Sequence, residues 1–231
     1  LRGKEPVVLK RHEAYIGVLI DDLVTKGTNE PYRMLTSRCE YRLLLREDNA
    51  DRRLSEIGHE VGLLDDAKYA KYQARWQAID DELARLEEVV LRPSEAQPIL
   101  DACGGEPLHK SVSLYDLLKR PNIHYADLLA HGYGREELPA DVVEEVDIII
   151  QYTGYIIKQE EQVARTAKLE SRRLPDQMDY SQVSNLRLEA RQKLDAVQPE
   201  TVGQASRISG VNPADITALL VWLEQSRRDV Q

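Results

Sequence analysis

The stretch from Pro139 to Pro175 reads PADVVEEVDIIIQYTGYIIKQEEQVARTAKLESRRLP. Its apolar residues recur every three or four positions, which predicts one long helix reaching about Arg173. Leu174-Pro175 then ends the helix, because a residue before proline disfavours the helical conformation. Gly154 lies in the middle, where glycine costs up to about 1 kcal/mol relative to alanine, so we expect another group to approach closely there. A helix this long indicates a mainly α-helical protein.

Three shorter helices are predicted after the long one, over residues 186–196, 202–209 and 213–226. Asn212-Pro213 is typical of a helix start, with an N-cap followed by proline at the first helical position. Val221 and Trp222 lie off the apolar stripe of the last helix, either covered by neighbouring helices or free to dock another protein. We therefore expect a terminal three-helix module.

Upstream, apolar residues from Tyr69 to Val90 are spaced alternately three and four apart, which predicts a helix over about 65–91 with a narrow seam. The seam fits an oligomerisation helix or one arm of an intramolecular hairpin, and we favour the hairpin. Residues 92–139 are rich in turns, so their order cannot be predicted. The expected division is a connector with an arginine-rich segment (1–64), a hairpin-like region (65–139) and a C-terminal helical module (140–231).

The N-terminal part combines a helix predicted over Glu13–Lys26, ended by Gly27, with an arginine-rich stretch from Asn29 to Leu54. Within that stretch, TSRCEYRLLLRE has two local readings. A capping-box pattern favours a helix start, whereas alternating leucines and arginines favour a short strand within 39–46. In both cases Arg42 and Arg46 share a face, because a spacing of four keeps one face in either period. Two arginines on one face suit an anion site.

Composition describes an ordinary globular chain, with 42% apolar and 31% charged residues over 231 positions. Cys39 and Cys103 lack metal-ligand spacing, and we expect free thiols in a reducing compartment. The histidines likewise lack zinc spacing, so no metal site is expected. No run of about 18 apolar residues is present, so we expect no membrane span and a cytoplasmic protein. The net charge is −9, with the acid concentrated between residues 54 and 164.

Motifs for catalysis and nucleotide binding are missing from the sequence. There is no GxGxxG, GxxxxGK[ST], HExxH or GxSxG pattern. Adjacent acids such as Asp21-Asp22 are typical of solvated helix faces and do not indicate a convergent pocket. We therefore expect the chain to hold no cofactor and to carry no catalytic residue of its own.

Three ordered blocks, EAYIGVLIDDLVTKGTN, EPYRMLTSRCEYRLLLREDNAD and TVGQASRISGVNPADITALLVWLE, resemble the glucose-inhibited division protein A family. YTGYIIKQEEQ in the long helix resembles the same family. These are flavin-dependent enzymes that install a carboxymethylaminomethyl-type group on the wobble uridine of tRNA. The resemblance implies an all-α C-terminal fragment that lacks the FAD-binding domain. FAD and NADH would serve the full-length homodimer, which works with a GTPase subunit.

The resemblance also assigns roles to residues. Residues expected to bind tRNA are Arg33, Arg38, Arg42, Arg46, Lys158 and Arg207. Residues expected to bind the partner are Gly203, Gln204, Ser206 and Trp222. From charge alone we would favour a structural role, in which the arginines pair with Glu40, Glu47, Asp48 and Asp51. The resemblance favours RNA phosphate, with Tyr32 or Tyr41 as stacking groups.

Two other functions remain open at this point. One is a purely structural helical scaffold that makes protein–protein contacts through the last helix and the 65–91 seam. The other is a stand-alone DNA-binding module, since the Gly203–Asp215 segment superficially resembles a helix-hairpin-helix. The acidic middle of the chain and Asn212, where that motif prefers glycine, disfavour the DNA-binding module.

Overall fold

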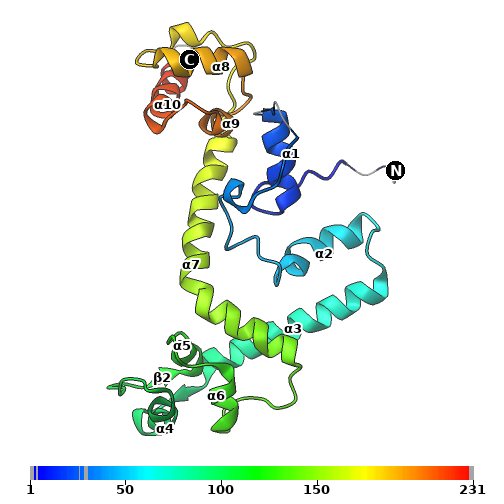
Figure 1. Cartoon of the computed structure of the whole chain (residues 1–231), viewed down its shortest axis with the longest axis vertical. Coiled ribbons are helices and arrows are strands. Elements are labelled where there is room, and N and C mark those ends of the chain that lie inside the picture. The colour runs from blue at the N-terminus through cyan, green and yellow to red at the C-terminus, as the bar shows by residue number, and fades with distance from the viewer. Residues whose placement is uncertain (1–2, 4, 26, 29–30, 229–231) are drawn as a thin grey trace. The chain divides into compact units, whose positions relative to one another are not determined.

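The computed structural model describes residues 3, 5–25, 27–28 and 31–228, and it confirms the all-α prediction. Its α-helices before residue 139 are α1 (Tyr15–Thr25), α2 (Ala50–Glu60), α3 (Asp66–Glu88), α4 (Pro93–Cys103), α5 (Leu114–Leu118) and α6 (Tyr125–Ala130). Those after residue 139 are α7 (Ala140–Glu170), α8 (Leu188–Val197), α9 (Val202–Arg207) and α10 (Pro213–Arg228). Short 3-10 turns lie at Thr36–Arg38 and Tyr180–Gln182. Figure 1 shows α7 as the longest helix, as predicted.

The chain forms two compact units. The continuous unit is Arg46–Ile157, and the discontinuous unit combines Leu1–Leu45 with Lys158–Gln231. Helix α7 contributes its first part to the continuous unit and its last part to the discontinuous one. The three-part division predicted from the sequence stays a prediction.

Helix α3 organises the continuous unit. The Asp65 carboxylate accepts a hydrogen bond from the Lys68 amide at 2.8 Å and so caps the helix, close to its predicted start at about residue 65. Along the predicted seam, Trp76, Ile79 and Leu86 are buried in the core of the unit. These seam residues therefore pack against other parts of the same chain, which agrees with the intramolecular hairpin that we favoured over an oligomerisation helix.

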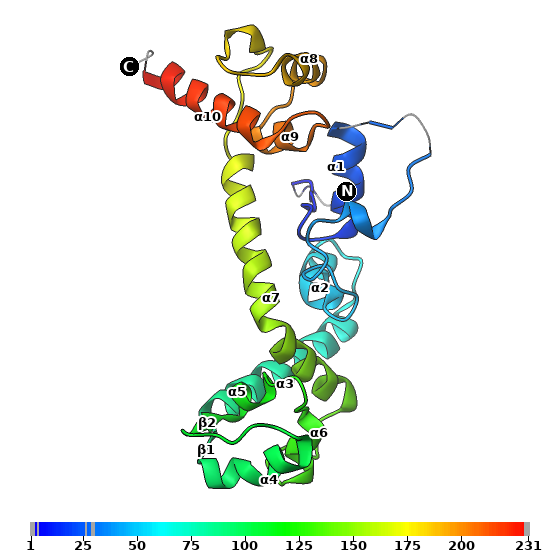
Figure 2. The same cartoon turned by 60° about the vertical axis from the view of Figure 1, so that its left-hand side comes forward.

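The turn-rich region between α3 and α7 is ordered around the same core. Strands β1 (Val90–Leu91) and β2 (Val112–Ser113) pair antiparallel, with Val90 opposite Ser113. Figure 2 shows this ribbon beside α4 and α5. Buried side chains from the region join the α3 seam, and they include Ile99, Leu100, Leu114, Leu117, Leu118, Ile123, Tyr125 and Leu128. Short helices thus complete a core that the sequence pattern did not reveal.

A buried carboxylate fixes α6 against α3. Glu82 has no exposed surface and accepts hydrogen bonds from the Tyr125 hydroxyl at 2.7 Å and from Arg85. Burial and the neighbouring carboxylate raise the pKa of Tyr125 to about 12. The hydroxyl therefore keeps its proton at neutral pH and continues to donate to Glu82.

In the discontinuous unit, α1 differs from the expected arrangement. Ile16 and Ile20 are apolar, yet both side chains are about half exposed. The helix instead buries Gly17, Val18 and Asp22. Asp22 is turned inward by an ion pair, described below, which outweighs the hydrophobic pattern. Lys26, the expected end of this helix, lies outside the described residues, and so do Asn29 and Glu30 at the start of the arginine-rich stretch.

Residues 37–47 contain neither of the two predicted elements. A single 3-10 turn covers Thr36–Arg38, and the next turn is closed by the Leu45 amide bonding the Tyr41 carbonyl at 3.0 Å. Tyr41 and Leu45 are buried and hold this segment to the unit. The structure has no strand within residues 39–46, so that prediction is wrong. The apolar residues that suggested a strand are buried from a tight turn instead.

Helices α8, α9 and α10 gather at the C-terminal end of α7 (Figures 1 and 2), as the predicted three-helix module requires. The start of α10 is a reciprocal cap. The Asp215 amide bonds the Asn212 side chain at 3.0 Å, and the Asn212 amide bonds the Asp215 carboxylate at 2.9 Å. Arg187, before α8, also donates to the buried Asp215 carboxylate at 2.6 Å. The Asp215 carboxylate thus connects the start of α10 with the start of α8.

This cap makes the module sensitive to acid. Hydrogen bonds from Arg187 hold the pKa of Asp215 below its ordinary value, against the opposing effect of burial. An acid whose pKa is lowered by folding contributes stability above its unfolded pKa of about 3.9, and this stability is lost as the pH falls through the folded pKa. Asp215→Asn is therefore expected to lower stability at pH 7 by about 1–3 kcal/mol. The difference from wild type should shrink below about pH 4, as measured by urea denaturation at each pH. A constant difference between pH 7 and pH 3 would contradict this account.

Membrane-spanning helices and metal-ligand clusters are both missing from the described residues. Among them, no helix is long and apolar enough to cross a membrane. Within the same residues, no cluster of three or more histidine, cysteine, aspartate or glutamate side chains is placed to hold a metal ion. Cys39 and Cys103 are both free thiols.

Candidate functional site

The arginine-rich loop of residues 31–45 is anchored by Arg11, which the sequence did not single out. The Arg11 side chain is only 10% exposed. Its guanidinium donates hydrogen bonds to Asp21 at 2.9 Å, to Asp22 at 2.8 Å and to Glu40 at 2.6 and 2.8 Å. One buried cation thus links the segment before α1, α1 itself and the loop.

Arg11 and Glu40 stabilise each other's charged form. Burial would lower the pKa of Arg11, but hydrogen bonds and attraction from Glu40 and Asp22 outweigh it and hold that pKa above its usual value. Burial opposes ionisation of Glu40, but the Arg11 hydrogen bond dominates and leaves its pKa below the ordinary value. The Tyr32 hydroxyl donates to Asp22 at 2.8 Å, extending the network into the loop.

Three of the predicted tRNA-binding residues lie on this loop with exposed side chains. They are Arg33, Arg38 and Arg42. The Arg38 guanidinium lies over the Tyr32 ring at 4.4 Å, a cation–π contact that orients it. Arg42 follows Tyr41, whose side chain is buried and therefore does not offer a stacking surface. The loop thus presents arginine groups from a fixed backbone.

A second anchor holds the far end of the loop to α7. The amides of Leu43 and Leu44 both donate to the Gln159 side-chain oxygen, each at 3.1 Å. Lys158, the neighbouring residue on α7 and a predicted tRNA-binding residue, is exposed. The structure therefore places Lys158 next to the glutamine that holds the loop.

Arg46 has a different environment in the continuous unit. Its side chain is 15% exposed, and its Nε lies 3.0 Å from the Asp48 carboxylate. Buried Glu145 lies 3.9 Å away, and the guanidinium is 5.7 Å from the centre of the Tyr152 ring. Charge alone suggested that the arginines pair with nearby acids, and Asp48 is the suggested acid that pairs with Arg46. Arg42 and Arg46 belong to different units, so their common face stays a prediction.

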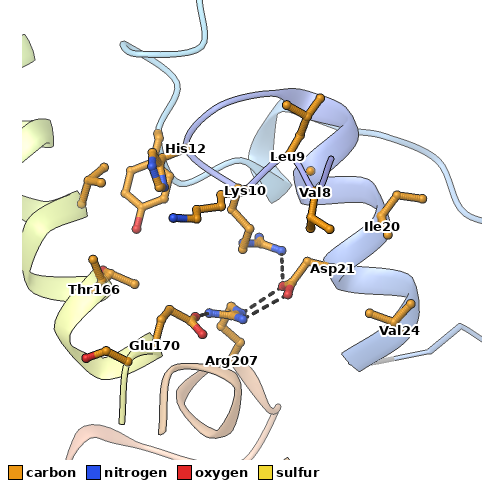
Figure 3. A pocket seen from close by; sticks show the side chains of 16 residues that line it. Val8, Leu9, Lys10, His12, Ile20, Asp21, Val24, Thr166, Glu170 and Arg207 are labelled. Atoms are coloured by element: carbon orange, nitrogen blue, oxygen red, sulfur yellow. Dashed lines mark hydrogen bonds and ion pairs between the residues drawn. The ribbon is translucent and has the colours of Figure 1, made fainter. Parts of the chain in front are cut away.

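Arg207 is also engaged by acids (Figure 3). From α9, it lies 3.1 Å from the Asp21 carboxylate of α1 and donates to Glu170 at the end of α7. Its side chain is 14% exposed. Thr201, the α9 N-cap, donates from its hydroxyl to Glu170 at 2.9 Å. Arg207 therefore joins three helices of the discontinuous unit.

A cavity of about 510 Å³ lies beside these ion pairs. Figure 3 shows its wall built from the segment before α1, from α1, from the end of α7 and from Arg207. Its apolar lining includes Val8, Leu9, Ile20, Val24, Val163 and Ala167. Lys10 and His12 add polar groups to the wall. Sequence reasoning did not find this cavity, because its walls come from segments more than a hundred residues apart.

The predicted partner-binding residues are spread over α9 and α10. Gly203 is buried, and a Cβ there would overlap the Glu170 carboxylate, so glycine is needed for close packing. The Gln204 side chain accepts a hydrogen bond from the Glu200 amide at 2.8 Å, whereas Ser206 is exposed. Trp222 packs partly buried against the module's core, and the neighbouring Val221 is 49% exposed. The four residues form no single exposed patch.

Arg11 and Glu170 are the residues of the candidate site that sequence reasoning missed. A signal exists for Arg11, since an isolated arginine precedes a helix that carries two adjacent acids. Nothing in the local sequence of Glu170 indicates its bonds to Arg207 and Thr201, because both partners lie more than 30 residues away.

Most of the chain matches the models of two known domain families. A family model described as the tRNA modifying enzyme MnmG/GidA C-terminal helical domain matches residues 66–160. A second, the tRNA modifying enzyme MnmG/GidA C-terminal helical bundle, matches residues 162–231. The chain belongs to the MnmG/GidA family. The resemblance seen in the sequence is thereby confirmed.

Similar proteins in the MnmG/GidA family are considerably longer than this chain. The tRNA uridine 5-carboxymethylaminomethyl modification enzyme MnmG of Heliobacterium modesticaldum is 55% identical over 99% of this chain and 37% of its own length. The MnmG of Bacillus subtilis is 53% identical over 97% of this chain and 36% of its own length. The chain thus spans little more than a third of these curated MnmG relatives.

A solved structure of a GidA protein shares the fold. Aquifex aeolicus GidA, in its form II crystal, matches with a TM-score of 0.72 and 40% identity. The match covers 96% of this chain and 34% of the GidA chain.

Proposed function

We propose that this chain is the tRNA-docking and partner-binding region of an FAD-dependent enzyme that modifies the wobble uridine of tRNA. Support comes from the two family models and from relatives named as tRNA uridine 5-carboxymethylaminomethyl modification enzymes. The chain has no glycine-rich dinucleotide motif, so the proposal gives it no part in holding FAD or NADH.

The observation that carries the proposal is the anchored loop with exposed arginines. Guanidinium groups bind phosphate oxygens through a planar fork of donors, and their affinity benefits when the backbone that presents them is already ordered. Arg33, Arg38 and Arg42 are exposed on a loop that is held at Tyr32 by Asp22, at Glu40 by Arg11 and at Leu43 and Leu44 by Gln159. In the proposal, these three arginines and Lys158 contact the RNA backbone.

The remaining two predicted tRNA-binding residues receive a supporting role in the proposal. Arg46 and Arg207 already lie within 3.1 Å of carboxylate oxygens and are mostly buried. An RNA phosphate would have to compete with those carboxylates. We therefore expect these two arginines to stabilise the elements that present the loop.

A double substitution tests the RNA contact. Arg33→Ala with Arg42→Ala is expected to weaken tRNA binding roughly tenfold or more, because hydrogen bonds to charged groups are worth about 1.5–3 kcal/mol each. The slope of log affinity against log salt should fall by about one for each lost phosphate contact. Fluorescence anisotropy with a labelled tRNA transcript, over a series of salt concentrations, measures both quantities.

Arg165→Ala provides the matched control, since Arg165 is an exposed arginine on α7 outside the loop. It should leave affinity and salt slope unchanged. Wild-type binding by a folded double variant would refute tRNA docking by the loop and favour the scaffold alternative.

Partner binding is the second part of the proposal. Val221 is exposed on α10 beside the partly buried Trp222, which is the arrangement of an apolar contact surface. A GTPase subunit and a second copy of the full-length protein are the partners that the resemblance implies. This surface also suits the alternative function, a helical scaffold that makes only protein–protein contacts.

A further inference from the structure

Helix α2 is attached to the continuous unit without a fully buried side chain of its own. Its contacts with α3 are largely polar. Arg52 pairs with Asp80 at 2.9 Å and lies 4.5 Å from the centre of the Trp76 ring, and Asp51 pairs with Arg75 at 3.2 Å. A helix held mainly by charged groups responds to a change of charge close to those groups, because no apolar core of its own fixes it in place.

Glu145 of α7 is the buried acid closest to this attachment. Its side chain is 2% exposed, and no group of the described residues donates a hydrogen bond to its Oε1 atom. Its contacts with cations are long, at 3.6 Å from Arg75 and 3.9 Å from Arg46. A buried acceptor without a donor is costly, and more so when it is charged. The carboxylate form of Glu145 is therefore poorly stabilised.

The charges around Glu145 add to this cost. They come from the segment before α2, from α2, from α3 and from the first turn of α7, and they are Arg46, Asp48, Asp51, Arg75 and Asp141. The three acids lie 2.9–3.2 Å from the two arginines, closer than Glu145 does. Burial raises the pKa of Glu145 above its ordinary value, and the acids add to this effect while the arginines oppose it.

We infer that the protonation state of Glu145 controls how firmly α2 is attached to its unit. Ionised Glu145 gives the cluster four negative charges against two positive ones. A neutral carboxyl removes one surplus negative charge and supplies an O–H donor among carboxylate acceptors. The attachment is therefore firmer when Glu145 is neutral. The inference does not depend on the proposed tRNA docking, because no RNA group takes part in it.

The direction of the pH dependence follows from the raised pKa. Below the unfolded value of about 4.3, Glu145 is neutral whether α2 is attached or not, and it carries no penalty. As the pH rises from there through the raised pKa, the detached state loses the proton first, so the attachment weakens. Above the raised pKa the full penalty is present.

Glu145→Gln keeps the side chain neutral at every pH and tests the inference. At about pH 8, the amides of α2 should exchange with deuterium on the order of tenfold more slowly in the variant than in wild type, as expected for relief of one unsatisfied buried group. At about pH 4 the two proteins should exchange at similar rates, since wild-type Glu145 is then neutral as well. Hydrogen exchange of the whole chain, followed by NMR, compares both proteins at the same pH, so the intrinsic exchange rates cancel.

Glu144→Gln is the matched control. Glu144 is the neighbouring residue on α7 and is exposed, so the same chemical change there should leave the exchange of α2 unaltered. Equal exchange by Glu145→Gln and wild type at about pH 8 would overturn the inference. Slower exchange in Glu145→Gln by the same factor at both pH values would also overturn it, because that result would show better packing of glutamine and no dependence on the proton.

Discussion

Replacing Arg11 with methionine is expected to lower the free energy of unfolding of the protein by about 3–5 kcal/mol. The cause is the uncompensated charge left behind, since Asp22 is 3% exposed and Glu40 and Asp21 are partly buried beside it. Removal of one partner of a buried ion pair costs more than the pair itself contributes. Urea denaturation followed by circular dichroism measures the change.

Arg33→Met is the matched control for Arg11→Met. Arg33 is exposed on the loop of the same unit. Its substitution should change the free energy of unfolding by about 0.5 kcal/mol or less, as is usual for surface positions. A triple variant that also neutralises the acids, Arg11→Met with Asp22→Asn and Glu40→Gln, should recover part of the loss. Equal stability of Arg11→Met and wild type would show that the network contributes nothing.

Alanine substitution at Gly17 is expected to destabilise the protein by about 1–3 kcal/mol or more, the usual cost of overpacking. In most helices glycine-to-alanine is stabilising, so the sign is the informative result. At Gly17 a Cβ would lie 2.6 Å from the Leu9 carbonyl oxygen and would also overlap that of Lys10. These atoms belong to the backbone and cannot rotate away. Urea denaturation again gives the free energy.

Gly154→Ala supplies the opposite case for comparison. The site is mid-helix and open. The same substitution should therefore stabilise the protein by up to about 1 kcal/mol. A stabilised Gly17→Ala protein would mean that the segment before α1 does not pack on this helix. A destabilised Gly154→Ala protein would mean that a group does approach that position.

The sequence was sufficient wherever local chemistry decides the structure. Asp65 and Asn212 each cap a helix by bonding an amide three residues on, so the starts of α3 and α10 were predictable from adjacent residues. The spacing of Trp76, Ile79 and Leu86 likewise predicts a buried seam, because periodicity needs no knowledge of the partner. The resemblance supplied the family in advance of any geometry.

The loop of residues 31–45 was not predictable for the opposite reason. Its local pattern fits a helix or a strand, and the outcome was set by Arg11 and Gln159, which lie far away in the sequence. The same holds for the candidate site. Arg33 and Arg42 are exposed, and their contact with RNA stays a prediction. Arg46 pairs with Asp48, a neighbour that charge alone suggested, whereas Arg207 pairs with Asp21, which no spacing rule identifies.

The division of the chain into a continuous and a discontinuous unit also affects the order in which contacts can form during protein synthesis. A ribosome releases residues 46–157 as one uninterrupted segment, so every contact within that unit is available once it has emerged. Residues 1–45 emerge earlier, but the hydrogen bonds to Gln159 and the ion pair with Arg207 cannot form until those two residues have been made. Closing such a large loop costs entropy and slows folding. The bonds between the arginine loop and Gln159 can therefore form only after the whole of residues 46–157 has emerged.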